Sequence, residues 1–139
     1  MLFQRRPPSL RRLLIVEDEP LVAFDNEHVL EDAGHEIVAT VDSFAGALAA
    51  LQRGGIDLIV SDVRLHGDGG GIDVAHAAKD AGVPVLFVTG ACPPDAAALA
   101  MGCLAKPYSP RQLVQAIAAI ARQVKGVRAK PVKGLTLFG

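Results

Sequence analysis

Residues 13–20 read LLIVEDEP, a short apolar run that stops abruptly at three acids and a proline. An uninterrupted apolar run is typical of a buried parallel strand, and the acids mark the point where such a strand reaches the edge of its sheet. Pro20 and the acids suit the first turn of a helix, and apolar residues at roughly helical spacing continue to Gly34. The stretch therefore predicts a strand that leads directly into a helix.

The same pattern recurs four more times along the chain. The predicted strands cover residues 36–40, 57–61, 85–89 and 103–105, and the helices that follow them cover 43–53, 71–81, 95–101 and 110–125. Strands that alternate with helices predict a parallel sheet with right-handed crossovers and helices on both faces. The fold class is therefore α/β, and we expect a doubly wound, flavodoxin-like (βα)5 sheet with strand order 2-1-3-4-5.

Length and composition suit one domain. The chain has 139 residues, and half of them are hydrophobic, which is enough to fill a single core. We expect the domain to cover residues 11–125, with an N-terminal tail over 1–10 and a C-terminal tail over 126–139. The tails carry basic residues, but a net charge of −1 gives no global field toward nucleic acid or anionic lipid. We expect no direct DNA binding and no membrane association.

The cysteines and the hydropathy pattern indicate a soluble, cytoplasmic protein. Only Cys92 and Cys103 occur, and their spacing suits neither zinc nor a disulfide scaffold. We expect Cys103 to be a small buried hydrophobe in the fifth strand and Cys92 to be a loop thiol more open to oxidation. The N-terminus lacks the apolar stretch of a secretory signal, and no apolar run approaches the roughly 18 residues that span a bilayer.

Polar residues follow four of the predicted strands directly. Glu17 and Asp18 follow the first strand, Asp62 the third, Thr89 ends the fourth, and Lys106 follows the fifth. In an open parallel sheet, ligands bind beyond the carboxyl ends of the strands, near the point where strand order reverses. We therefore expect these five side chains to meet at one edge of the sheet.

This set of residues fits phosphoryl transfer. Carboxylates that converge repel one another unless a cation neutralises them, and oxygen ligands of this type suit Mg²⁺. Phosphoryl transfer requires in-line positioning and cations that offset charge on the oxygens, and a carboxylate can be the nucleophile. Asp62, Mg²⁺ and Lys106 would supply these parts. The Thr89 hydroxyl could bond a phosphoryl oxygen in the modified state alone, as a switch requires.

Four short motifs together carry a resemblance to a known family. They read Val-Glu-Asp at 16–18, Ser-Asp-Val at 61–63, Val-Thr-Gly at 88–90 and Lys-Pro-Tyr at 106–108. Each is weak alone, but all four stand in order at the ends of predicted strands. The chain from about residue 11 to residue 125 thus resembles the receiver domain of response regulators in bacterial two-component systems.

The resemblance implies a role for each site residue. Asp62 is the residue that takes a phosphoryl group, from the phosphohistidine of a sensor histidine kinase or histidine phosphotransferase. Glu17 and Asp18 hold Mg²⁺ directly or through water, and Asp62 and the backbone carbonyl of Arg64 complete the ligands. Lys106 pairs with the phosphoryl group or, before modification, with Asp62. The family also has a cis peptide bond before the proline that follows this lysine.

The resemblance also implies how the protein works. We expect a stand-alone phospho-acceptor module that catalyses only its own phosphorylation and dephosphorylation and is otherwise no enzyme. Its signal would pass to an unknown protein target through the surface around the fourth helix, fifth strand and fifth helix. The sequence leaves a homodimer open.

Two features depart from the common family pattern. Receivers commonly carry an aromatic switch residue where this chain has Cys103, and Phe-Val-Thr-Gly at 87–90 resembles the Phe-Ala-Thr-Gly of alphaproteobacterial single-domain regulators without that ring. We therefore expect the loop from Thr89 to Asp95, with its glycine and two prolines, to be the moving element. The glycine-rich stretch at 66–71 lacks phosphate-loop spacing and is expected to be a flexible connector.

Other interpretations of the same residues stay open at this point. The acids at 17–19 alone could be helix-capping residues, and Asp62 and Lys106 could be a structural ion pair. The chain could also be a binding module that never takes phosphate, or a Mg²⁺-dependent phosphohydrolase, although the DxDxT pattern of one such class is missing. The four histidines share no spacing, and we expect them on the surface.

Overall fold

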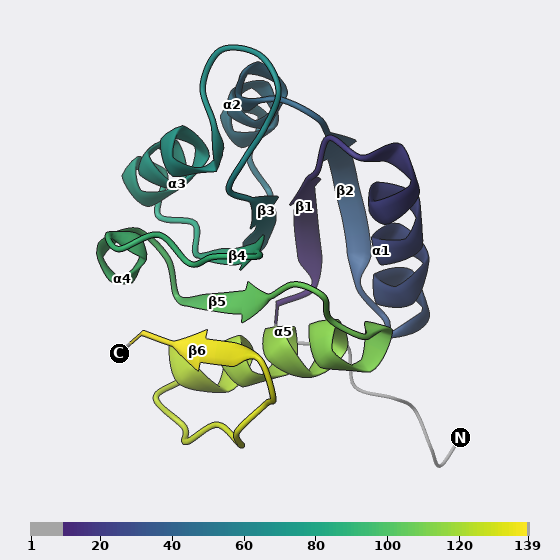
Figure 1. The fold of residues 1–139 in the computed structure, drawn as a ribbon, viewed down its shortest axis with the longest axis vertical. Helices are drawn as coiled ribbons and strands as arrows, with labels where there is room; N and C mark the ends of the chain where they lie inside the picture. The colour runs from purple at the N-terminus through teal and green to yellow at the C-terminus, as the bar shows by residue number, and fades with distance from the viewer. Residues whose placement is uncertain (1–9, 139) are drawn as a thin grey trace.

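Within residues 10–138, which the computed structural model describes, six strands form one sheet in the order β2-β1-β3-β4-β5-β6 (Figure 1). The strands are β1 (Arg12–Val16), β2 (Glu36–Val41), β3 (Leu58–Asp62), β4 (Val85–Thr89), β5 (Gly102–Ala105) and β6 (Leu135–Leu137). The first five pair in parallel, which confirms the predicted order 2-1-3-4-5. The N-terminal tail expected over 1–10 lies, up to residue 9, outside the described residues.

Five helices cover the two faces of this sheet. They are α1 (Pro20–Asp32), α2 (Phe44–Arg53), α3 (Gly71–Asp80), α4 (Ala96–Leu99) and α5 (Pro110–Val124). Helices α1 and α5 lie on one face, and α2, α3 and α4 lie on the other (Figure 1). This is the doubly wound α/β arrangement that the sequence predicts. None of the helices among residues 10–138 has the length and apolar character that crossing a membrane requires.

The first strand shows why its sequence is apolar without alternation. Leu13 and Ile15 pack into the core under α1 and α5, whereas Leu14 and Val16 pack into the core under α2 and α3. All four side chains are buried because both faces of the strand are covered. An apolar run of this kind identifies an interior strand of a covered sheet.

Helix α4 is shorter than the predicted span of 95–101. It covers only Ala96–Leu99, and the backbone of Ala100 is already extended. The Met101 N–H donates to the carbonyl of Val85 at 2.8 Å, so pairing between the strands claims the residues that would continue the helix. Tertiary structure thus overrides the helical pattern here.

The start of α5 is fixed by a capping box three residues after Lys106. The Gln112 N–H donates to the Ser109 hydroxyl at 3.1 Å, and the Ser109 N–H donates to the Gln112 side chain at 2.7 Å. These bonds satisfy donors that the first turn would otherwise leave free. The cap therefore fixes the residue at which the β5–α5 connection, which carries Lys106, ends.

The segment after residue 125, which we expected to be a tail, contains β6. This strand pairs antiparallel with β5, with Leu135 beside Leu104 and Leu137 beside Gly102. A Cβ atom on Gly102 would lie 2.9 Å from the carbonyl oxygen of Thr136, so the close pairing uses the missing side chain. The strand covers the edge of β5 that the five-stranded sheet would have left open.

His35 corrects the expectation that all four histidines lie on the surface. Its side chain is buried, and its Nδ1 lies 2.7 Å from the carbonyl oxygen of Leu10. Burial lowers the pKa of the His35 imidazole, although the nearby backbone carbonyls partly oppose that effect. His28, His66 and His76 are exposed, as expected.

We predict that His35 makes the protein less stable in mild acid. Because its pKa is lowered in the folded protein, the unfolded chain takes up a proton at a higher pH than the folded chain does. Neutral His35 therefore contributes to stability at pH values above the ordinary histidine pKa. That contribution is lost as the pH falls from the ordinary pKa toward the lowered pKa of the folded protein. Urea unfolding at several pH values should show a smaller loss in His35→Asn than in the wild type. Equal losses in the two would contradict the assignment, and His76→Asn, at an exposed position, is the control.

Gly71 opens α3 where the chain passes very close to β3. Its N–H donates to the carbonyl of Val63 at 2.8 Å, and a Cβ atom on it would lie only 2.1 Å from the carbonyl oxygen of Asp62. No side chain fits there without moving the backbone that carries Asp62. One glycine of the connector is therefore required by packing.

We predict that Gly71→Ala destabilises the protein by about 1–3 kcal/mol through this backbone clash. Gly90→Ala is the matched control, because Gly90 has an ordinary φ and a Cβ atom there would meet nothing within 4 Å. Its effect should stay within about 0.5 kcal/mol. Chemical denaturation of both variants measures the difference, and equal stabilities would show that the chain relaxes around Gly71 at no cost.

Candidate functional site

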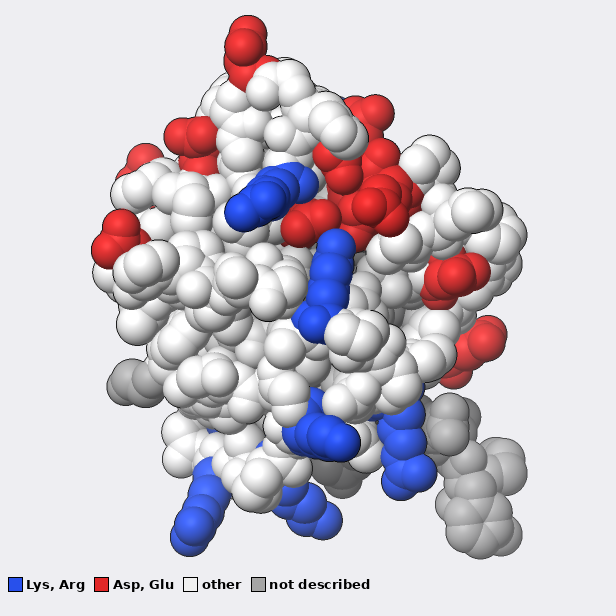
Figure 2. Space-filling view, viewed as in Figure 1, with Lys and Arg blue, Asp and Glu red and all other residues white. Residues whose placement is uncertain are grey.

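The predicted site residues meet at the carboxyl ends of the strands. Glu17 and Asp18 follow β1, Asp62 ends β3, and Lys106 follows β5. Because β1 and β3 are neighbours, one carboxylate oxygen from each of the three acids lies within 4.8 Å of the other two. Figure 2 shows a dense group of acidic side chains on this part of the surface, with basic side chains beside it.

Glu17 is the most buried of the three acids. Only 3% of the residue is exposed, and its Oε2 accepts a hydrogen bond from the Glu19 N–H at 3.1 Å. Its Oε1 is buried and has no hydrogen-bond partner among residues 10–138. Burial raises the pKa of the Glu17 carboxyl, although the Glu19 bond and the charge of Lys106 oppose that effect.

The oxygen of Glu17 that lacks a hydrogen bond fits a cation. A buried carboxylate oxygen without a partner costs free energy, and two further carboxylates beside it add repulsion. Three oxygen donors within 4.8 Å of one another match the ligands that Mg²⁺ takes in proteins. Capping of α1 does not explain the group, because Glu19 is its N-cap and makes no side-chain capping bond.

Asp18 is tied to the connector between β3 and α3. Its Oδ2 accepts the backbone N–H of His66 at 2.9 Å and lies 2.6 Å from Nδ1 of the same histidine. The His66 side chain is exposed, whereas that of Asp18 is largely buried. Sequence reasoning gave His66 no role, because the contact joins residues 48 positions apart and no local pattern announces it.

Lys106 is the cation of the site. Its Nζ donates to Oδ2 of Asp62 at 3.1 Å and lies 3.6 Å from Oε1 of Glu17. Burial alone would lower the pKa of the Lys106 ammonium, but the Asp62 hydrogen bond and the Glu17 charge outweigh it and raise the pKa. The amine therefore stays charged. The Lys106–Pro107 peptide bond is cis, in agreement with the resemblance.

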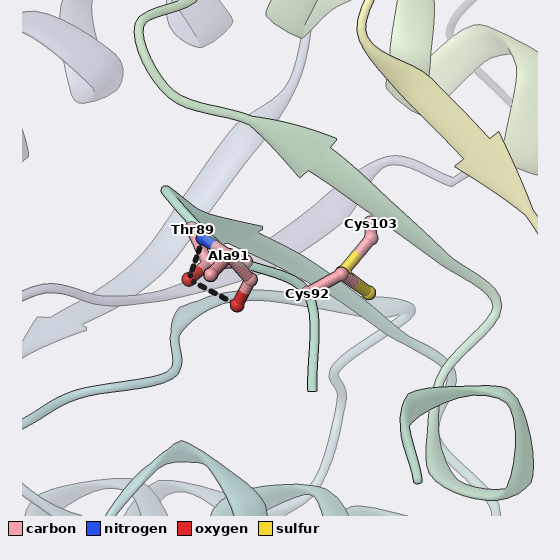
Figure 3. The surroundings of a disulfide bond; sticks show 4 residues. All are labelled: Thr89, Ala91, Cys92 and Cys103. Carbon is pink, nitrogen blue, oxygen red and sulfur yellow. Dashed lines mark hydrogen bonds between the residues drawn. A yellow bond between two sulfur atoms is a disulfide. The ribbon is translucent and has the colours of Figure 1, made fainter. Parts of the chain in front are cut away.

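Thr89 ends β4, but its hydroxyl is bonded within its own loop. Its Oγ1 accepts the Ala91 N–H at 3.2 Å and donates to the Ala91 carbonyl at 3.1 Å (Figure 3). A cavity of about 510 Å³ is lined by Thr89 together with Asp62, Arg64 and Lys106, among others. The threonine therefore lies at the site with its hydroxyl held by Ala91.

Asn26 and Tyr108, which the sequence did not single out as a pair, support the connection between β5 and α5 that carries Lys106. Asn26, buried in α1, donates from its side-chain amide to the Tyr108 hydroxyl at 2.9 Å. Burial raises the pKa of the Tyr108 phenol, while the Asn26 bond opposes that effect. The bond links α1 to the segment between Lys106 and α5.

The two cysteines correct an expectation. We expected Cys103 to be buried and Cys92 to be a loop thiol, and their exposures agree, since Cys103 is 3% exposed and Cys92 is exposed. The structure nevertheless joins their sulfurs in a disulfide, with 6.2 Å between the two Cα atoms (Figure 3). They were not paired from sequence because only the adjacency of β4 and β5 brings residues 92 and 103 together.

Comparison with known proteins gives the family. Residues 13–118 match the model of the response regulator receiver domain. The chain is 34% identical over 79 residues to the phyllosphere-induced regulator PhyR of Methylorubrum extorquens, an alignment that covers 55% of this chain and 30% of PhyR. It is 33% identical over 116 residues to the sensory transduction protein RegX3 of Mycobacterium tuberculosis, which covers 80% of this chain and 51% of RegX3. The chain thus spans about half or less of these relatives.

Solved structures agree. A response regulator receiver protein from Sinorhizobium medicae superposes with a TM-score of 0.70 at 28% identity, and the match covers 81% of this chain and 94% of that one. The family match over residues 13–118 includes the strands whose carboxyl ends carry the acids, the threonine and the lysine. With a family model that spans most of the sheet and a site of this composition at its edge, the chain belongs to the response regulator receiver domain family.

Proposed function

We propose that this receiver accepts a phosphoryl group on Asp62 from the phosphohistidine of a histidine kinase or histidine phosphotransferase. One observation carries the proposal. The Asp62 carboxylate lines an open cavity, has a charged amine 3.1 Å away, and shares its surroundings with two further carboxylates. A structural ion pair would need Lys106 and Asp62 alone and would not explain Glu17 and Asp18.

The residues of the site match the demands of the transfer. An oxygen of Asp62 bonds to phosphorus while the P–N bond of the donor breaks, and the released imidazole takes a proton. Lys106, already beside Asp62, would follow the charge onto the phosphoryl oxygens. Glu17, Asp18 and Asp62, with the carbonyl of Arg64, would hold Mg²⁺, which when bound offsets the charge on those oxygens.

Thr89 supplies the conformational readout in this proposal. Its hydroxyl is engaged with Ala91, so a bond to a phosphoryl oxygen would require that engagement to break. The Ala91 amide would then need a new partner, and the loop between β4 and α4 would rearrange. A bond available only in the phosphorylated state would favour one of two loop positions.

The signal would pass to a protein partner on the face formed by α4, β5 and α5. Strand β6 covers the outer edge of β5, so a partner on this side would meet β6 in place of that edge. A related structure is described as the anti-anti-sigma factor PhyR from Bartonella quintana. We propose a protein partner for this chain as well, and a cytoplasmic location where kinase and target are both available.

Phosphorylation in vitro tests the proposed function. With Mg²⁺ and acetyl phosphate, intact-mass spectrometry should find one acid-labile phosphoryl group on the wild type and on Asp68→Asn, which changes an exposed acid of the neighbouring connector. Asp62→Asn should carry none, because the nucleophile is lost. Lys106→Met should be labelled about a hundredfold more slowly, because the cation that offsets the charge is removed.

Two outcomes would contradict the proposal. One is equal labelling of Asp62→Asn and the wild type, which would place the acceptor elsewhere. The other is a folded wild type that takes no phosphoryl group from acetyl phosphate or from any phosphohistidine donor, which would favour a constitutive binding module.

A further inference from the structure

The disulfide joins the loop expected to move to a strand that is paired on both sides. Cys92 lies in the connection between β4 and α4, whereas Cys103 is a buried residue of β5, held between β4 and β6. Cys92 is an exposed residue, whereas Cys103 is 3% exposed, so Cys92 is the more open of the two to a soluble thiol or disulfide. Exchange chemistry would therefore begin at Cys92.

The disulfide lies next to the residue that holds the Thr89 hydroxyl. Ala91 forms both hydrogen bonds with Thr89, and Cys92 is the next residue (Figure 3). A small cavity of about 70 Å³ is lined by Thr89, Gly90 and both cysteines, among others. The loop is thus held at Ala91 by the hydrogen bonds with Thr89, and at the next residue, Cys92, by the disulfide to β5.

We propose that Cys92 and Cys103 are a reversible redox modification site, whose disulfide holds the β4–α4 loop in place and weakens the response of the receiver to phosphorylation. The coupling to phosphorylation rests on the proposed function of Asp62. The bond itself does not.

Glutathione disulfide is the class of oxidant that we name. The Cys92 thiolate attacks one of its sulfurs and releases one glutathione thiolate, which leaves a mixed disulfide on Cys92. The Cys103 thiolate then attacks the Cys92 sulfur and releases the second glutathione. The two cysteines lose two electrons and two protons, and glutathione disulfide gains both as two glutathione thiols. In a reducing cytoplasm, a protein disulfide is more often such a sensor than a permanent brace.

The reduced protein can keep the same fold. A free thiol at Cys103 is a small apolar group, and it would remain packed among the core residues that include Phe87. Breaking the bond therefore frees the loop without emptying the core. The loop could then follow Thr89 when its hydroxyl leaves Ala91, whereas the oxidised loop is tied to β5 and resists that step.

The experiment compares the oxidised and reduced full chain. Protein equilibrated with glutathione disulfide should lose two free thiols and two hydrogens by intact mass, and excess reduced glutathione should restore both. With Mg²⁺ present, the oxidised form should bind beryllofluoride, a phosphoryl analogue, about tenfold more weakly than the reduced form, a coupling of ordinary size for two linked sites. NMR titration gives both affinities.

Cys92→Ser is the matched control, because it changes an exposed loop residue and cannot form the bond. It should bind beryllofluoride like the reduced wild type under both conditions. The amides of Gly90 and Ala91 should exchange hydrogen more slowly in the oxidised wild type than in the reduced one, with or without the analogue.

Three results would overturn the proposal. They are thiols that stay free under glutathione disulfide, equal beryllofluoride affinities in the two forms, and equal exchange at Gly90 and Ala91. If neither form binds beryllofluoride, the phosphorylation proposal fails, and the exchange rates and thiol counts still decide whether the bond holds the loop.

Discussion

The crowding of three carboxylates at one end of the sheet is the constraint on which the site depends. Glu17 and Asp18 follow β1 and Asp62 ends β3, and the parallel pairing of these strands brings their carboxylates together. Lys106 is a single positive charge beside them, and one oxygen of Glu17 lacks a hydrogen bond among the described residues. This arrangement is costly for the folded protein alone, and in the proposed function a divalent cation would offset the charge of the three carboxylates and of the phosphoryl group.

Contacts around the acids keep them in this position. The Asp18 bond with His66 holds the connector after β3, and Gly71 lets α3 begin against the backbone of Asp62. On the other side, the bond between Asn26 and Tyr108 links α1 to the connection that carries Lys106. The site is therefore held by elements that are far apart in sequence. A change in any of these contacts would alter the positions of the acids or of Lys106.

The sheet and the site could be predicted because both depend on strongly local patterns. Uninterrupted apolar runs such as residues 13–16 mark interior strands, and the polar residue that ends each run must lie at the sheet edge. The features that were missed depend on contacts between distant residues. Pairing with β5 creates β6, and the bond from Met101 to Val85 of β4 ends α4 early. The buried His35 contacts the Leu10 carbonyl, and the adjacency of β4 and β5 brings Cys92 to Cys103.

The structure of the protein with Mg²⁺ and beryllofluoride bound tests the central claim most directly. We expect beryllium on a carboxylate oxygen of Asp62, Mg²⁺ ligated through Glu17, Asp18 and Asp62, and the Lys106 amine moved from Asp62 to a fluoride. A structure of the folded protein, at saturating concentrations of both, with the three carboxylates free of metal and Lys106 still on Asp62 would contradict it.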